Sequence, residues 1–283
     1  MKQVLHVGLV VEGNSTRSTV LRLPKLVEEI GPVKAGLLRV ARRISNFLRA
    51  GYAVAEYSEL QSARLILLRV PDAMVSRIVS EISQSTLDLK EMVFVLCETW
   101  MCSDDLHQLE ERGAQVASLV EAPGVRGAWY IVEGSPSATR QVKRLLEGCD
   151  ARGLELRRGT KPLFFASCLF ANVLALPLFL CAEEALRSAG IAGNNMYALL
   201  DEMGQGMMRD FANGARTPWG GPLAECSTET AVQYMKSLRE KDGELADLLE
   251  DQLKLSRRLL SHSKKPVEDA SAQRLRIGVL PDS

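Results

Sequence analysis

Apolar runs alternate with helical patterns along the first half of the chain, and this alternation ends near Gly159. Parallel strands need crossover connections, which are usually helices, so the alternation predicts a parallel sheet covered on both faces. The runs that we predict to be strands span residues 4–11, 32–38, 63–72, 92–98, 114–120 and 128–134. We therefore expect an α/β fold with a doubly wound, Rossmann-like domain over residues 1–158.

Beyond Gly159 the strand signals stop. Helical periodicity covers residues 161–189, 196–213, 228–239 and 244–261. We predict an all-helical domain over residues 159–263. The tail over residues 264–283 is polar and lacks sustained periodicity, so we expect it to be mobile.

Composition narrows the class of protein. Hydrophobic residues make up 46% of the chain, which excludes a disordered protein, and 35 basic residues balance 35 acidic ones. This balance argues against bulk electrostatic binding to nucleic acid. The six cysteines have irregular spacings that do not predict a metal site. With no secretory pattern at the N-terminus, we expect a protein of the reducing cytoplasm.

Residues 163–182 form a stretch of twenty residues without a charge, which is long enough to cross a bilayer. A helix buried on all sides of a large core has the same composition, and we favour that interpretation over a membrane span. Its apolar face also suggests a homodimer, since a domain of about a hundred residues can bury only part of its surface.

The sequence "VVEGNSTRS", residues 10–18, follows the first predicted strand. Rossmann proteins hold pyrophosphate on a G-x-G-x-x-G turn at this place, and here Gly13 is the middle glycine while Val11 and Thr16 replace the other two. The residues that could bind pyrophosphate in this loop are Gly13, Asn14, Ser15, Thr16, Arg17 and Ser18. Alternatively, the same hydroxyl side chains simply cap the first helix.

Three arginines, Arg39, Arg42 and Arg43, follow the second predicted strand. An NAD site places an acidic residue here, whereas arginine suits the 2′-phosphate of NADP. Arg39 falls directly at the end of the predicted strand, and Arg43 lies one helical turn further on. They predict NADP as the cofactor, unless they belong to the solvated face of the next helix.

Three passages carry a resemblance to a known family: "ARLILLRVPDAMV" (63–75), "FFASCLFANVLALPLFLCAEEALRSAGI" (164–191) and "TPWGGPLAECSTETAVQYMKSL" (217–238). With the order of domains, they make the chain resemble the superfamily of 6-phosphogluconate dehydrogenase and pyrroline-5-carboxylate reductase. Within it, the chain looks most like a bacterial family of Rossmann-like oxidoreductases that depend on NADP or a deazaflavin. The resemblance implies that residues 159–263 are similar to the C-terminal domain of 6-phosphogluconate dehydrogenase.

The resemblance also implies site residues. It places Val70 and Pro71 beside the cofactor, and it assigns the handling of a small-molecule substrate to a Lys and an Asn, here Lys161 and Asn172. These two are eleven positions apart, three turns of helix, so they can share one face. Alternatively, Lys161 lies on the surface before the helix begins, and Asn172 bonds within a buried helix.

The chain departs from the family where the chemistry is expected. Phe164 and Phe165 stand where members have a His, and "CETWMCSDD" (97–105) replaces a His-Thr-Ser-Gly-like turn. An oxidoreductase needs a proton donor or acceptor near the reacting carbon. Two hypotheses therefore stay open: an NADP-dependent oxidoreductase acting on a small molecule, and a non-catalytic Rossmann-like protein that binds a nucleotide or a partner.

Overall fold

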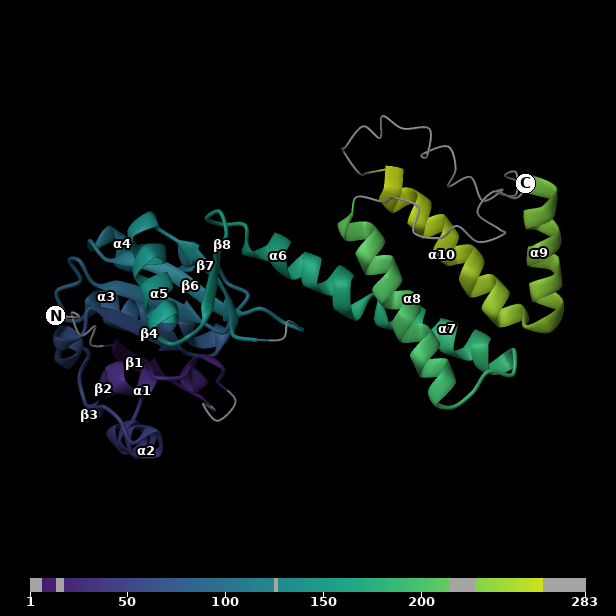
Figure 1. Cartoon of the computed structure of the whole chain (residues 1–283). Coiled ribbons are helices and arrows are strands. Elements are labelled where there is room, and N and C mark those ends of the chain that lie inside the picture. Colours follow the sequence, from purple (N-terminus) through teal and green to yellow (C-terminus); the bar gives the residue numbers. More distant parts are fainter. Residues whose placement is uncertain (1–6, 14–17, 125–126, 214–226, 262–283) are drawn as a thin grey trace. The chain divides into compact units, whose positions relative to one another are not determined.

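The structure is a computed structural model that describes residues 7–13, 18–124, 127–213 and 227–261. The chain divides into two compact units, Met1–Val173 and Leu174–Ser283. Figure 1 shows the first as a sheet with helices and the second as helices. The predicted tail lies outside the described residues, as do residues 217–226 of the passage 217–238.

The first unit is built on one sheet in the order β3-β2-β1-β4-β5-β6-β7-β8. The strands are β1 (Val7–Val11), β2 (Ile30–Lys34), β3 (Tyr52–Val54), β4 (Leu65–Arg69), β5 (Val93–Cys97), β6 (Gln115–Glu121), β7 (Trp129–Gly134) and β8 (Arg152–Glu155). Their pairings are parallel except that β7 runs antiparallel to β6. The predicted α/β fold with a Rossmann-like sheet is confirmed.

The sheet differs from the prediction at its edges. We did not predict β3 and β8, and β8 is largely exposed, so its sequence lacks the apolar pattern of a buried strand. We expected β7 to be parallel, but the short link from Glu121 to Trp129 gives no room for a helical crossover, and the two strands pair antiparallel.

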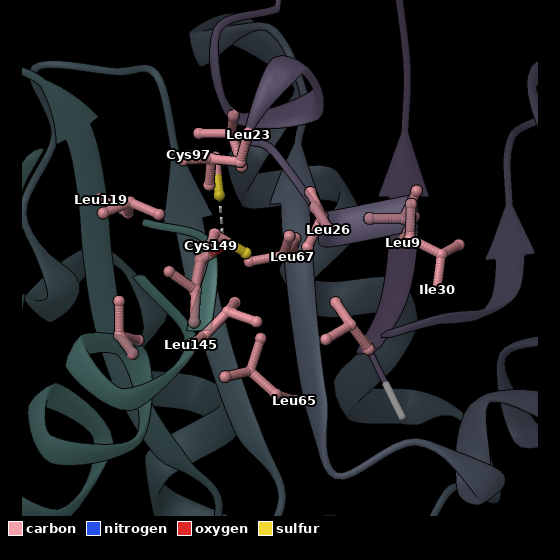
Figure 2. Packing of buried hydrophobic residues seen from close by; sticks show 14 of the residues in the cluster. Leu9, Leu23, Leu26, Ile30, Leu65, Leu67, Cys97, Leu119, Leu145 and Cys149 are labelled. Atoms are coloured by element: carbon pink, nitrogen blue, oxygen red, sulfur yellow. Dashed lines mark hydrogen bonds between the residues drawn. The ribbon is translucent and has the colours of Figure 1, made fainter. Parts of the chain in front are cut away.

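Two apolar layers hold helices to the two faces of the sheet. On one face, side chains of β1, β4 and β5 pack against α1 (Leu26–Glu29), α2 (Leu38–Leu48) and α5 (Pro136–Gly148). On the other face, alternate side chains of β4 and β5 pack against α3 (Val75–Gln84) and α4 (His107–Glu111). Figure 2 shows part of the first layer, where Leu67, Cys97 and Cys149 lie close together near Leu26.

Short 3-10 turns carry the chain away from several strand ends. They are η1 (Val20–Arg22), η2 (Tyr57–Ser62), η3 (Asp72–Met74) and η4 (Ser103–Leu106). Since η1, η3 and η4 follow the carboxyl ends of β1, β4 and β5, they frame the edge of the sheet where Rossmann folds bind ligands.

A long helix begins at Lys161 with α6 (Lys161–Cys168), passes through a π-helical turn, η5 (Leu169–Val173), and continues as α7 (Leu176–Ser188). In the second unit, α7 packs against α8 (Asn194–Ala212), and α9 (Thr228–Lys241) packs against α10 (Gly243–Ser261). The predicted helices over 161–189, 196–213, 228–239 and 244–261 match these elements closely.

The prediction that residues 163–182 are buried on all sides within one chain is wrong. The helix Lys161–Ser188 has a mean hydropathy of 2.2 over its most apolar window, none of which is buried. By length and composition it could cross a membrane, a weak criterion that core helices also meet. Its exposed large side chains include Leu169, Phe170, Leu176 and Leu180. These residues have too few neighbouring elements in the described chain to cover them.

Candidate functional site

The order of the strands reverses between β1 and β4, and the two strand ends meet there. Gly13 follows β1 with a φ of +70°, a conformation that favours glycine. A Cβ atom at Gly13 would lie 3.0 Å from Pro71 Cγ, just beyond β4. Gly13 and Pro71, both predicted from sequence, are therefore packed together, and Val70 is buried beside them. Asn14, Ser15, Thr16 and Arg17 lie outside the described residues.

A carboxylate from β5 reaches the start of η1. Glu98 directly follows β5, and its Oε1 accepts hydrogen bonds from Ser18 Oγ at 2.6 Å and from the Val20 backbone N–H at 2.8 Å. Its Oε2 forms an ion pair with Arg69 at the end of β4. Thr19 Oγ1 also points to Oε1, at 3.4 Å. This network joins the ends of β4 and β5 to the segment after the phosphate loop, where we had predicted no charged partner.

A shallow pocket of about 370 Å³ opens at the carboxyl ends of β5 and β6. It is lined by Thr19, Glu98, Val120, Glu121, Ala122, Pro123 and Gly124. Glu98 is held by Arg69, whereas the half-buried Glu121 makes no side-chain hydrogen bond or ion pair within the described part of the chain. The pocket thus presents one unpaired carboxylate.

Asn172 lies at this pocket. It is exposed on the π-helical turn, and its Nδ2 donates a hydrogen bond of 3.1 Å to the Cys168 carbonyl. A Cβ atom at Gly124, in the pocket lining, would lie 2.9 Å from Asn172 Oδ1. Asn172 is therefore beside the pocket. Of the expected alternative, the hydrogen bond within the helix is present, whereas the burial is wrong, since the helix surface is exposed there.

Lys161 occupies a different place. It is the first residue of α6 and is completely buried, so the alternative that it lies on the surface is wrong. Its Nζ donates a hydrogen bond of 2.9 Å to the Met101 carbonyl. Burial lowers the pKa of Lys161 to about 8, although the nearby Glu133 carboxylate opposes the shift. Lys161 is not part of the pocket lining that Asn172 approaches.

Glu133 is the buried counter-charge to Lys161, and we did not predict it. Its carboxylate accepts hydrogen bonds from the Ser103 N–H and Oγ, from Ser118 Oγ and from the Gly159 N–H, each at 2.8 or 2.9 Å. These hydrogen bonds hold the pKa of Glu133 below its usual value, against the effect of its burial. An acidic residue inside the apolar strand 128–134 was the available signal, because a buried carboxylate must find partners.

The predicted arginines lie on α2, away from the end of β2. The strand ends at Lys34, four residues before we had placed its end, so the prediction that Arg39 stands directly at the strand end is wrong. Apolar residues at the start of α2 had extended the predicted strand. Arg39, Arg42 and Arg43 are exposed.

Among the described cysteines, Cys97 and Cys149 are buried packing residues, whereas Cys102, Cys168 and Cys181 are half-buried. Burial raises the pKa of the Cys97 thiol well above its usual value, with the Glu98 carboxylate adding to the shift. A thiolate is the reactive form, so this thiol is inert at neutral pH. Within the described ranges, no group of three His, Cys, Asp or Glu side chains could hold a metal ion.

No protein-family model and no curated protein sequence matches the chain. Its fold is similar to that of an imine reductase from Aspergillus terreus, solved with NADPH4 and dibenz[c,e]azepine, with a TM-score of 0.66, 15% identity and coverage of 93% of this chain and 96% of that chain. It is also similar to a reductive aminase from Aspergillus terreus, solved with NADPH and ethyl levulinate, with a TM-score of 0.59, 15% identity and coverage of 93% and 95%.

A third similar structure is an imine reductase variant from Myxococcus stipitatus in complex with NAD+, with a TM-score of 0.61, 13% identity and coverage of 91% of this chain and 95% of that chain. At these identities the likeness establishes the fold: a Rossmann-like sheet domain followed by helices, over nearly the whole chain.

Proposed function

We propose that the chain is an NADP-dependent oxidoreductase that acts on a small molecule. The observation that carries this proposal is the contact of Gly13 with Pro71 where the order of the strands reverses. Doubly wound sheets bind dinucleotides in the crevice at that point. The similar folds of reductases that were solved with NADPH support the choice of cofactor.

In this proposal the cofactor lies along the carboxyl ends of β1, β2 and β4. Gly13 lets the backbone approach the pyrophosphate, and Asn14, Ser15, Thr16 and Arg17 add donors to it. Val70 and Pro71 form an apolar wall, while Arg39 and Arg43 on α2 supply positive charge for the 2′-phosphate. NADPH bound there would supply the hydride. A deazaflavin, the other cofactor of the resembling family, is the second one to test.

The pocket at the ends of β5 and β6 is the proposed substrate site. We assign Asn172 to contact with the substrate because it lies beside Gly124 in the pocket lining. An amide can donate to an oxygen and accept from an N–H, so it can orient a polar small molecule. Lys161 is fully buried and bonded to the Met101 carbonyl, so we assign it a positioning role through the turn Cys97–Ser103.

A non-catalytic Rossmann-like binding protein is the second candidate. The Glu98 carboxylate already takes the hydrogen bonds of Ser18 and the Val20 N–H, which are groups at the start of η1 that a phosphate could otherwise use. A carboxylate at this place opposes an anionic ligand by like-charge repulsion. This observation favours a loop that no longer holds pyrophosphate.

We further propose that the protein is a cytoplasmic homodimer, without a membrane span or a nucleic-acid partner. The exposed apolar side chains of η5 and α7 support the dimer, since a second copy would remove them from water.

The deciding experiment measures binding of NADPH, NADH and a deazaflavin to the whole protein by calorimetry, with a titration of buffer alone as the blank. Binding of NADPH supports the oxidoreductase. If no cofactor binds to folded protein, the proposal is wrong and the second candidate stands.

A further inference from the structure

The end of β2 carries an acidic group that comes from a different strand. In Rossmann folds an acidic residue about 20 residues beyond the phosphate loop binds the ribose 2′-hydroxyl. Gly36 stands at this spacing from Gly13, just after β2, and has no side chain. A Cβ atom at Gly36 would lie 2.7 Å from Glu12 Oε1 and 3.3 Å from Oε2. The carboxylate of Glu12 therefore fills the space beside Gly36.

The backbone fixes Glu12 at this place. Its N–H donates a hydrogen bond of 3.0 Å to the Arg69 carbonyl, which extends the pairing of β1 with β4 by one residue. The side chain is half-buried and forms no ion pair within the described residues. It can therefore accept hydrogen bonds from a ligand.

The basic residue nearest to the strand end has other partners. Lys34, the last residue of β2, is buried; its Nζ donates to the Ala35 carbonyl at 2.7 Å and lies 4.9 Å from the centre of the Tyr57 ring. Tyr57 in turn donates a hydrogen bond of 2.9 Å to Glu81 Oε2. Lys34 thus has partners of its own and forms no ion pair with Glu12 within the described residues, so the Glu12 carboxylate beside Gly36 is left to a ligand.

We infer that Glu12 binds the adenosine ribose of the dinucleotide and weakens the preference of the protein for a 2′-phosphate. Its carboxylate accepts hydrogen bonds from the 2′- and 3′-hydroxyls of NADH and repels the phosphate of NADPH. The positive charges of Arg39, Arg42 and Arg43 on α2 act in the opposite direction and favour the 2′-phosphate of NADPH. This inference rests on the proposed function, because it requires that a dinucleotide binds beside β1 and β2.

The test compares dissociation constants for NADH, NADPH, 5′-AMP and 2′,5′-ADP in the unchanged protein and in Glu12→Gln. The last two probes differ only in the 2′-phosphate, so they report on the ribose alone. We compare the dissociation constants within each pair, NADH with NADPH and 5′-AMP with 2′,5′-ADP. In both pairs we expect Glu12→Gln to change the ratio by about tenfold in favour of the probe that carries the 2′-phosphate.

A second variant and a control separate this effect from damage to the fold. Gly36→Ala adds the Cβ atom that would displace the Glu12 carboxylate, and we expect a smaller shift in the same direction. Glu81→Gln removes a carboxylate that binds the Tyr57 hydroxyl, and we expect no change in the ratio. Circular dichroism checks that each variant is folded.

An unchanged ratio in Glu12→Gln, with binding intact, overturns the inference and leaves the proposed function standing. If the unchanged protein binds none of the four probes, the inference and the proposed function are both overturned.

Discussion

Ser18 Oγ donates a hydrogen bond of 2.6 Å to Glu98 Oε1 across eighty positions of sequence. Glu98 also forms an ion pair with Arg69, and only 12% and 19% of these two side chains are exposed. The Glu98 carboxylate therefore connects the end of β5, the end of β4 and the segment that begins at Ser18. Removing one member of a largely buried ion pair leaves the other charge without compensation.

We expect Glu98→Ala to lower the free energy of unfolding by about 3 kcal/mol, because Arg69 and the Val20 N–H lose their acceptor. Urea unfolding measures this loss. Glu121→Ala is the matched control, since Glu121 lines the same pocket without a side-chain partner in the described structure. It should cost less than about 0.5 kcal/mol. Equal losses in the two variants would show that the network adds no stability.

The stability of the protein should depend on pH through Lys161. Its native pKa of about 8 lies below its usual value of 10.5, so between these pH values the unfolded chain binds a proton that the native state does not. Stability therefore rises with pH in this window. We expect the unfolding free energy of the unchanged protein, relative to Lys161→Met, to increase by about 3 kcal/mol from pH 7.5 to 10.5. Taking the difference between the proteins removes the contributions of tyrosines and cysteines. A difference in unfolding free energy between the two proteins that does not change with pH contradicts the prediction.

Gly13→Val should abolish NADPH binding while the protein stays folded by circular dichroism. The new side chain would meet Pro71 and would have to adopt a φ of +70°. We expect this strain to cost about 1 kcal/mol of stability. Gly113→Val is the control, because Gly113 also has a positive φ, of +92°, but precedes β6 at the opposite edge of the sheet. NADPH binding that survives in Gly13→Val would remove the loop from the proposed cofactor site.

Arg39→Asp should weaken NADPH binding by about 1.5–3 kcal/mol and leave NADH nearly unchanged, because arginine would contact only the 2′-phosphate. Calorimetric titrations of both nucleotides measure the difference. Arg144→Asp on α5 makes the same change of charge on an exposed helix beside other strands. An equal loss for both nucleotides would show that Arg39 does not recognise the phosphate.

We expect the exposed helix to make the protein dimeric. We also expect the protein to be extracted from cells without detergent. Leu176 and Leu180 are 59% and 56% exposed, and burying such side chains contributes about 1.5–3 kcal/mol each. Light scattering at micromolar concentration should give twice the mass of the chain, and Leu176→Lys with Leu180→Lys should give one chain mass. If the protein without substitutions has the mass of one chain, the predicted dimer is wrong. If it can be extracted only with detergent, both the dimer and the predicted extraction without detergent are wrong.

The sequence predicted features that depend on local pattern. β5 is a continuous apolar run between polar segments, and its bounds were found within a residue of the observed Val93 and Cys97. The phosphate-loop pattern singled out Gly13 and the family resemblance singled out Pro71, and the structure places these two residues together.

Features that depend on distant partners could not be predicted in this way. The eighty positions between Ser18 and Glu98 leave no periodic signal. Lysine is among the residues least often buried, so the sequence alone did not predict the burial of Lys161. The structure shows that its counter-charge, Glu133, comes from a strand distant in sequence. The end of β2 was misplaced because Leu37 and Leu38 continue the apolar pattern into α2.

The hydrogen bond from the Gly159 N–H to Glu133 limits how this fold can be divided or recombined. The last strand ends at Glu155, yet the buried carboxylate of β7 takes a donor and its neighbouring cation from residues that come after that strand. A gene fragment that ended at Arg158 would encode every strand but would leave an unneutralised charge in the interior. The sheet domain is therefore not a self-sufficient module at its last strand: to be transplanted or expressed alone, it must keep the beginning of the long helix.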